Sequence, residues 1–318
     1  MTQSELFKSY AEQNELYLNL TNNMQWFEFG GNKIGRLYIE GPDAEEFPKW
    51  RLIAKFKGEF PCHFTLVYVN GGAVGSPNIA THKDISTWFL LGGMGNNCLQ
   101  FTNKNILNKA SMLQEKSFFS AVSAHGGKYI YTFGGYENIE KVQLKCCEYY
   151  SIQEDKWYIN DEVQLNVARS QSSCCLFEDN LIFIFGGYNK DQGTLSSIER
   201  FQISQKKIVL LEIKMTIPLR RFATCKISAS KILLLGGISR LSKDSDAVFC
   251  FDIEDNNQSK KQKPDHTYSL ENLDKVDKAG VIDYPVIIDS VGSLHLFVEN
   301  SSGTSPPYRT CYSFLEYS

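Results

Sequence analysis

Four short segments of this chain run from a series of apolar residues directly into a pair of glycines. Their second glycines, Gly93, Gly135, Gly187 and Gly237, lie 42, 52 and 50 residues apart. A period of about 40–50 residues matches a supersecondary unit of several strands and is much longer than a heptad. The repeat therefore predicts that most of the chain is an array of similar β units.

The residues before each glycine pair indicate how these units pack. Residues 182–185 are all apolar, and a strand that is apolar on both faces is buried on both faces. The blades of a β-propeller, each packed between two neighbours, have this requirement. A glycine then permits a turn with positive φ, and its missing Cβ lets the next strand approach closely. We expect this structural role for Gly92, Gly93, Gly134, Gly135, Gly186, Gly187, Gly236 and Gly237.

The composition favours a folded protein without a nucleic-acid-binding surface. The chain has 318 residues, 42% hydrophobic content and a net charge of −3, which allows a full core and argues against a basic surface. No stretch approaches the 18 apolar residues of a membrane span, and the first residues contain no apolar region of the kind found in signal peptides, so we expect neither feature. The nine cysteines are odd in number and include two adjacent pairs. We therefore expect reduced thiols in a cytoplasmic protein, with cytoskeletal association as one option.

The repeat that begins at Gly134 and Gly135 is the most informative. Tyr150 follows the glycines, Trp157 stands seven residues later, and Arg169 precedes the next apolar segment. This order of residues resembles the kelch repeat. The resemblance implies an all-β, kelch-type β-propeller with blades of four antiparallel strands, in which Tyr150 and Trp157 pack in the core.

The other repeats keep the glycine pair and the spacing but change the tyrosine and tryptophan. These two places are taken by Phe101 and Asn108, by Phe201 and Ile208, and by Phe251 and Gln258. The glycine pairs and their spacing therefore carry the prediction for these units.

Both ends of the chain contain further strand patterns. Residues 25–56 predict three strands with a glycine pair at 30–31, and residues 284–317 predict three more, with a degenerate sixth repeat near 294–299. We expect six blades in a single propeller over residues 15–318, preceded by a short lead at 1–14. Propellers of this type often close by pairing the chain ends, and residues 15–20 are the candidate closing strand, because closure removes exposed edges.

Residues 254–278 are polar and charged and are too long for a hairpin turn. We expect a surface loop there. The alternative is a docking segment that uses Lys260, Lys261 and Lys263.

The sequence shows no motif for catalysis or for a cofactor. No two of the five histidines have the spacing of metal ligands, and there is no nucleophile elbow, phosphate-binding lysine loop or identifiable carboxylate pair. We therefore expect no enzyme activity, no metal and no cofactor.

Two sets of residues are candidates for binding. In kelch propellers an arginine at the mouth of the central channel commonly meets acidic groups, which by resemblance implicates Arg169, Arg221 or Arg220, and Lys116. Three converging cations would attract an acidic segment of another protein. The alternative is that each cation pairs with an acid of a neighbouring blade.

The second set consists of loop residues that follow the glycine pairs: Tyr136, Glu137, Tyr188, Asn189 and Arg240. Tyrosine and arginine are favoured anchors of protein interfaces. The alternative is that the tyrosines pack on strand ends within ordinary hairpins.

Three functions remain open on these grounds. The first is a non-catalytic protein-interaction module or scaffold subunit of a larger, cytoskeletal assembly. The second is a subunit that recruits substrates to a ubiquitin ligase, as many kelch proteins do with an additional domain. The third is a propeller that binds or processes a small molecule or sugar.

Overall fold

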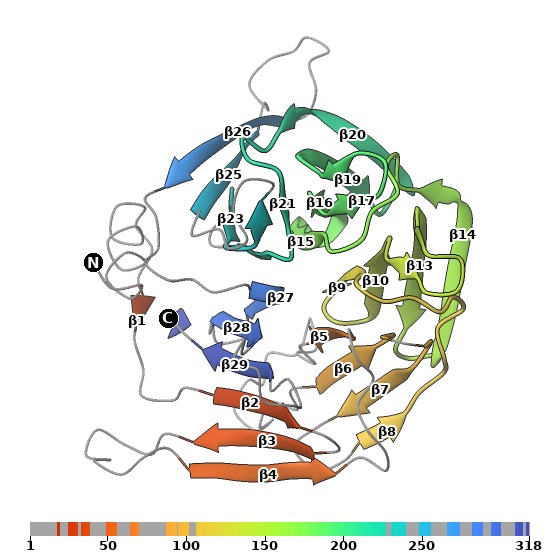
Figure 1. Cartoon of the computed structure of the whole chain (residues 1–318), viewed down its shortest axis with the longest axis vertical. Coiled ribbons are helices and arrows are strands. Elements are labelled where there is room, and N and C mark those ends of the chain that lie inside the picture. Colours follow the sequence, from red (N-terminus) through yellow and green to blue (C-terminus); the bar gives the residue numbers. More distant parts are fainter. Residues whose placement is uncertain are drawn as a thin grey trace, which may run out of the picture.

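We describe the fold from a computed structural model of the whole chain (Figure 1). The described residues are 18–19, 25–30, 33–38, 49–55, 64–69, 87–93, 95–101, 106–226, 230–239, 248–255, 266–273, 282–288, 294–299, 309–313 and 316–317.

Four sheets of four antiparallel strands form most of the described structure. Sheet 1 contains β5 (Thr65–Val69), β6 (Thr87–Leu91), β7 (Cys98–Phe101) and β8 (Ile106–Asn108). Sheet 2 contains β9 (Ser120–Ala124), β10 (Tyr129–Phe133), β13 (Cys146–Ser151) and β14 (Lys156–Gln164). Sheet 3 contains β15 (Ser173–Phe177), β16 (Leu181–Phe185), β19 (Ser197–Gln202) and β20 (Lys207–Lys214). Sheet 4 contains β22 (Ala223–Lys226), β23 (Lys231–Leu235), β25 (Val248–Asp255) and β26 (His266–Leu273).

The strands of the two chain ends form one further sheet. Its order is β27 (Ile282–Ile288), β28 (Leu294–Glu299), β29 (Arg309–Ser313), β2 (Gln25–Gly30), β3 (Lys33–Tyr38) and β4 (Lys49–Lys55). Figure 1 shows the five sheets around a central axis, and the innermost strands β5, β9, β15, β22 and β27 contact one another in a ring. The all-β propeller arrangement is therefore confirmed.

The chain ends differ in detail from the expectation. Six blades were expected. The pairing of β2 with β29 joins the described end strands into one six-stranded sheet, so the described strands include five sheets of four or more strands. This pairing covers two edges that would each leave backbone groups open. Residues 15–20 were expected to close a blade, whereas β1 (Leu18–Asn19) pairs with β30 (Glu316–Tyr317) in a separate two-stranded sheet. The predicted lead at 1–14 lies outside the described residues.

The expected polar loop at 254–278 contains a strand. β26 pairs with β25 over eight positions, from Val248 opposite Leu273 to Asp255 opposite His266. The charge of the surrounding residues obscured a period-2 alternation, in which Tyr268 and Leu270 alternate with polar residues. Lys260, Lys261 and Lys263 lie outside the described residues.

Apolar side chains fill the spaces between neighbouring sheets. In β16 all five residues are buried, as its uniformly apolar sequence predicted. Trp157 is 3% exposed and Tyr150 is fully buried, and both pack with Phe89 between sheets 1 and 2. The core role predicted for these two residues is confirmed.

In three glycine pairs, the first glycine (Gly92, Gly134 or Gly186) packs against the chain that enters the next sheet. Gly134 has φ +62°, and a Cβ atom there would lie 2.3 Å from the carbonyl oxygen of Arg169. No side chain fits at this distance, so the glycine is required by packing as well as by the turn.

Among the described residues, no helix is long and apolar enough to cross a membrane.

Candidate functional site

Arg169 was expected at the channel mouth, but it lies in the interior of sheet 3 with no exposed side-chain surface. Its guanidinium forms an ion pair with Glu199 on β19. It also donates to the carbonyl oxygens of Gly186 at 2.8 Å and Ser197 at 3.2 Å. Glu199 in turn accepts the backbone N–H of Asn166 at 2.7 Å, so the pair fastens the loop before β15 to the third strand of the same sheet.

Lys116 repeats this arrangement one sheet earlier. Its ammonium lies 2.9 Å from Glu148 on β13, and both side chains are fully buried. It also donates to Thr132 Oγ1 at 3.0 Å, while Glu148 accepts the backbone N–H of Gln114 at 3.0 Å. The cation therefore pairs with an acid as the alternative reading proposed, but the acid belongs to the same sheet, not to a neighbouring blade.

Burial is the largest single influence on the pKa of each cation, but the net direction of the shift differs between the two. It lowers the pKa of Arg169 below its ordinary value, although Glu199 opposes this shift. For Lys116, burial also favours the neutral form, but the sulfur of Cys146 and the carboxylate of Glu148 outweigh it and raise the pKa. Neither group is accessible to a ligand, so the predicted cluster of three cations at the mouth is wrong.

The third cation was assigned to the wrong repeat position. The backbone N–H of the second glycine binds the carbonyl oxygen of Lys116, Arg169 and Leu219 in successive repeats. Leu219, and not Arg220 or Arg221, is therefore the equivalent of Arg169. Sheet 4 also lacks the acidic partner. Glu199 pairs with Ile184, two residues before Gly186, and the residue at the same position in sheet 4, opposite Leu234, is Phe249. Leu219 and Phe249 are fully buried in one apolar cluster.

Arg220 instead ends the short strand β21 (Leu219–Arg220), and Arg221 follows in the turn that leads into β22. Arg220 lies over the ring of Tyr188, 5.2 Å from its centroid, and donates to Gln171 Oε1 at 3.1 Å. Arg221 has φ +55°, as Gln171 and Phe118 have +56° and +53° at the same point of the two preceding repeats. The N–H of Gln171 binds the carbonyl oxygen of Phe118, and the N–H of Arg221 binds that of Gln171. We call these three linked turns the entry turns.

The loop residues after the glycine pairs have two different roles. Tyr136 and Tyr188 are half-buried at the starts of the short hairpins β11–β12 (Tyr136–Glu137, Val142–Gln143) and β17–β18 (Tyr188–Asn189, Gly193–Thr194). Glu137 accepts the N–H of Ile139 at 2.8 Å within its turn. Arg240 lies outside the described residues.

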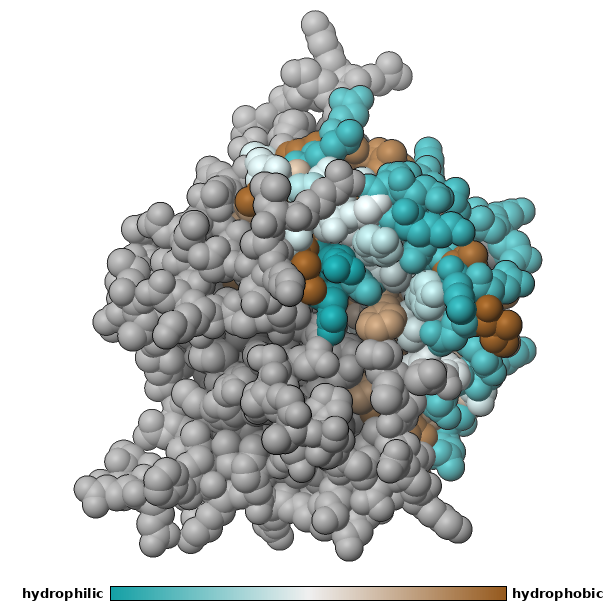
Figure 2. Space-filling model, viewed as in Figure 1, coloured by the Kyte–Doolittle hydropathy of each residue, from teal (hydrophilic) through white to brown (hydrophobic). Residues whose placement is uncertain are grey.

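Asn189, the fifth loop candidate, is 7% exposed and donates to the carbonyl oxygen of Ala168 at 2.7 Å. Glu137 and Asn189 therefore build the loops, while Tyr136 and Tyr188 stay accessible. We define the loop face by Tyr136, Gln171, Tyr188, Arg220 and Arg221. In Figure 2 the described surface is mostly hydrophilic, with isolated apolar residues.

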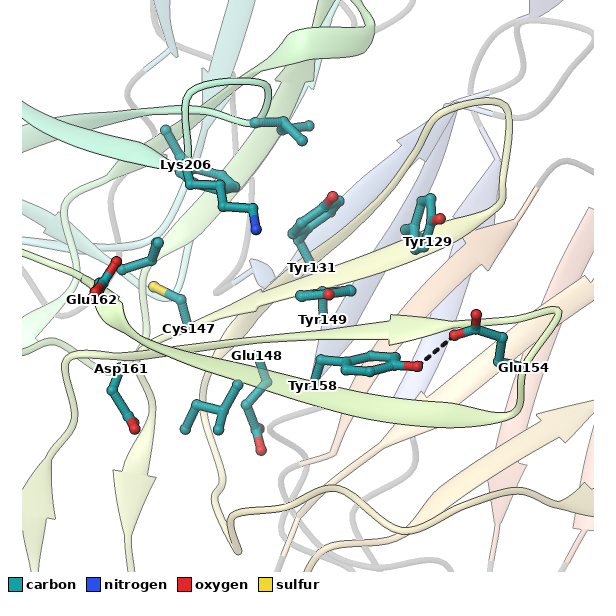
Figure 3. Close-up of a pocket in the computed structure, with 14 residues that line it drawn as sticks. Tyr129, Tyr131, Cys147, Glu148, Tyr149, Glu154, Tyr158, Asp161, Glu162 and Lys206 are labelled. Atoms are coloured by element: carbon teal, nitrogen blue, oxygen red, sulfur yellow. Dashed lines mark hydrogen bonds between the residues drawn. The ribbon is translucent and has the colours of Figure 1, made fainter.

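A cavity between sheets 2 and 3 was not anticipated from the sequence (Figure 3). It has a volume of about 960 Å³ and is lined by tyrosines of β10, β13 and β14, and by Phe201, Ile203 and Lys206 of sheet 3. Tyr131, Tyr149 and Tyr158 occupy directly opposed positions on the three adjacent strands, so they share one face of sheet 2. The sequence feature that could have indicated this cavity is the number of tyrosines in these strands. The sequence does not give the strand register, however, and the register is what aligns the rings. We call this cavity the tyrosine groove.

The described residues contain no group of three or more histidine, cysteine, aspartate or glutamate side chains suited to a metal ion. The thiols of Cys98, Cys146, Cys147, Cys174, Cys175 and Cys250 form no disulfide bond. Burial raises the pKa of Cys98 and of Cys175 to about 12, so these two thiols stay protonated at neutral pH.

Comparisons with known proteins agree with this architecture. Residues 119–270 match the family model described as the KLHDC2/KLHL20/DRC7 Kelch-repeats domain. A solved structure titled "Structure of YjhT" is 13% identical, with a TM-score of 0.54 over 76% of this chain and 74% of that one. At this identity the likeness concerns the fold alone. No curated protein matches the chain in sequence.

Proposed function

Residues 119–270 of this chain are kelch repeats of a β-propeller, and from this premise we propose that the protein is a non-catalytic interaction module that binds another protein through the loop face. Kelch-repeat propellers are generally protein-interaction modules without catalytic activity. The same fold can carry unrelated functions, so the proposal depends on the properties of the surface itself.

The contact between Arg220 and Tyr188 carries the proposal. The guanidinium and the ring lie 5.2 Å apart, and both side chains are only half-buried. Arginine and tyrosine are the residue types that contribute most to protein interfaces. Gln171 holds the guanidinium through a 3.1 Å hydrogen bond, so part of the ordering needed for binding is already present in the free protein.

The backbone beneath these side chains supports a scaffold role. The entry turns are joined by hydrogen bonds of 2.7 and 2.9 Å between successive repeats. A surface built on linked turns loses little conformational freedom when a partner binds. We propose that the chain acts as a subunit of a larger assembly, of which a cytoskeletal one is an example.

We further propose a cytoplasmic location. Six cysteines of the described strands that form no disulfide bond support this proposal, because a reducing compartment keeps cysteines in that form.

Affinity capture from a native extract tests the loop face. The wild type is compared with Tyr188→Ala/Arg220→Glu, and bound proteins are identified by mass spectrometry. Arg169 is unsuitable as a probe because its replacement would disturb the interior of sheet 3. The matched control is Glu178→Gln/Asp179→Asn, which removes two exposed carboxylates from the turn between β15 and β16, at the other end of β16 from the glycine pair.

We expect a stoichiometric partner that the loop-face variant loses and the control retains. A partner that survives Tyr188→Ala/Arg220→Glu, with unchanged melting behaviour of the variant, would exclude the loop face. Capture of no partner by the wild type would exclude the interaction module itself under these conditions.

A further inference from the structure

The hairpin β11–β12 carries the most exposed large apolar side chain of the described residues. Ile139 is 81% exposed, whereas Leu113, the next most exposed, is 56% exposed. Isolated apolar side chains on a protein surface are common and need no function. A role for Ile139 therefore depends on how its turn is built and on whether the fold requires an apolar residue there.

The turn that carries Ile139 is fixed by one carboxylate. Glu137 accepts the backbone N–H of Ile139 at 2.8 Å and also that of Glu140. Lys141 then completes the turn with φ +57°. Because the same side chain binds both N–H groups, the turn is held in one conformation, and the side chain of Ile139 is held in solvent.

The hairpin β17–β18 contains the same turn one sheet later. Here Asn189 replaces the carboxylate, since its Oδ1 accepts the N–H of Asp191 at 2.9 Å and that of the next residue at 3.3 Å. Gly193, with φ +78°, stands where the first turn has Lys141. The two turns are therefore equivalent up to this point, and the first hairpin has one extra residue after it.

The residue equivalent to Ile139 in the second turn is Asp191. Each follows the second glycine of its pair by four residues, and each donates its N–H to the side chain that fixes the turn. Both side chains are exposed. The same turn thus forms with a charged residue at this place, so its folding does not require isoleucine.

The first turn is also connected to the rest of the loop face. Gln143, on the second strand of the hairpin β11–β12, accepts the backbone N–H of Lys190 at 3.2 Å with its Oε1. Lys190 belongs to the hairpin that begins at Tyr188, and Arg220 lies over that ring. Ile139 and the contact between Arg220 and Tyr188 are thus parts of one connected surface.

An exposed apolar side chain at such a place favours an apolar counterpart. Burial of apolar surface drives most protein association, and a group that is already held in position loses little freedom when it is buried. The neighbours of Ile139 in the turn, Asn138, Glu140 and Lys141, are polar. An apolar centre within a polar rim is the usual composition of a protein interface.

The two described cavities of this chain do not match such a side chain. The tyrosine groove is lined by tyrosines and carboxylates as well as by apolar residues. A smaller cavity of about 270 Å³ is lined in part by Gln114, Lys145, Asp161 and Gln164. Neither is an apolar pocket that a second copy of this chain could offer to Ile139, so a different protein is the better counterpart.

We propose that the hairpin β11–β12 inserts Ile139 into an apolar pocket of the protein that the loop face binds. The inference rests on the proposed function and deepens it, since it adds an apolar anchor to the contact between Arg220 and Tyr188. The pocket has room for a branched aliphatic side chain and is bordered by polar groups that face Glu140 and Lys141.

Titration calorimetry on the full-length chain tests this proposal. The probe is the purified partner that the affinity capture described above identifies. Ile139→Val should weaken binding about fourfold, which is the effect of one buried methylene. Ile139→Thr gives a side chain of the same shape with a hydroxyl, and it should weaken binding about fivefold further.

A charged variant should give the largest effect. Ile139→Asp reproduces the residue of the second turn, so it should melt as the wild type does and yet bind about a hundredfold more weakly. Its heat-capacity change on binding should be less negative, because less apolar surface is buried. The matched control, Leu107→Asp, adds the same charge at another exposed apolar position, on the outermost strand of sheet 1, and should leave binding unchanged.

This inference and the proposed function can fail separately. Unchanged binding by Ile139→Asp, together with loss of binding by Tyr188→Ala/Arg220→Glu, would overturn the inference and leave the proposed function in place. Equal affinities of Ile139→Val and Ile139→Thr, or equal weakening by Leu107→Asp and Ile139→Asp, would also overturn it. Capture of no partner by the wild type would remove both.

Sedimentation distinguishes a second copy of this chain from a different protein. A concentration-dependent dimer of the wild type that Ile139→Asp abolishes would overturn the proposal and assign the hairpin to a contact between two copies. A wild type that stays monomeric, with the graded losses of affinity above, would support it.

Discussion

Arg169 and Glu199 form an ion pair in the interior of sheet 3, and neither side chain has exposed surface. The guanidinium also donates to three backbone carbonyl oxygens, of Val167, Gly186 and Ser197. The carboxylate accepts two backbone N–H groups, of Asn166 and Val167. Removing such charges from water is costly, and the additional hydrogen bonds offset that cost. The pair therefore joins the entering loop to the sheet and is unavailable to ligands.

Replacement of Arg169 by leucine should destabilise the protein by about 3–5 kcal/mol, because it leaves Glu199 charged and buried. The double variant Arg169→Leu/Glu199→Phe reproduces the residues of sheet 4, Leu219 and Phe249, and should recover part of this loss. Urea unfolding of the wild type, both single variants and the double variant measures the coupling. Additive effects of the two substitutions would contradict the pairing.

Truncation of Trp157 to alanine should cost about 3–5 kcal/mol, since it opens a cavity between sheets 1 and 2. The indole is 3% exposed, and its ring centroid lies 5.0 Å from that of Tyr150, with the two planes inclined by 34°. Its Nε1 donates a hydrogen bond to the carbonyl oxygen of Ala110 at 2.8 Å. Trp157→Phe keeps much of the packing and loses the hydrogen bond, so we expect a smaller cost of about 1–3 kcal/mol. Chemical denaturation would refute the prediction if the two variants were equally stable.

Gly134→Ala should destabilise the fold by about 2–4 kcal/mol, because the added Cβ overlaps a backbone carbonyl and the residue has positive φ. Gly95 also has positive φ, at +157°, but a Cβ there meets only the side-chain nitrogen of Asn97, at 3.1 Å. Gly95→Ala is therefore the control and should cost less. Equal melting temperatures for the two variants would show that backbone strain alone, and not the overlap with Arg169, sets the requirement for glycine.

Stability should fall as the pH drops below the ordinary range of aspartate titration. The hydroxyl of Tyr150 and the N–H of Ala110 bind the carboxylate of Asp155 and lower its pKa below its ordinary value of 3.8. A group with a lowered native pKa stabilises the fold fully above its unfolded pKa, and this contribution is lost as pH falls through the native pKa.

The variant Asp155→Asn keeps an acceptor oxygen and tolerates the positive φ of 49° at this position. Thermal melting between about pH 5 and pH 2.5 should therefore show a shallower pH dependence for this variant than for the wild type. Parallel curves for the two proteins would contradict the assignment.

The strands and the core were accessible from the sequence because they depend on local patterns. The apolar run of β16 and the glycine pairs predict a buried strand and a close approach, and both are present. The period of the repeat indicates the propeller. The strand β26 was missed since nearby charge concealed its alternation, and the pairing of β2 with β29 depends on two segments almost 280 residues apart.

The candidate site was less accessible because its chemistry depends on which side chains meet. Lys116 and Arg169 are cations of the expected repeat position, but only the register of β13 and β19 places Glu148 and Glu199 against them. In the same way, the tyrosine groove arises because three strands bring Tyr131, Tyr149 and Tyr158 into line.

The amino-acid sequence by itself determined that this chain is a repeated β structure and that β16 is buried on both faces. These two properties follow from apolar periodicity and from the conformational freedom of glycine, which act over a few residues. The resemblance to the kelch repeat added that Tyr150 and Trp157 belong to the core. Only the tertiary structure decided which charged side chains are buried in ion pairs inside the sheets and which stay accessible. Burial and ion pairing depend on contacts between strands that are distant in the sequence. Arg169 and Arg220 are both arginines near the start of an inner strand. Arg169 is buried against Glu199 and cannot contact a ligand, whereas Arg220 remains partly exposed and can.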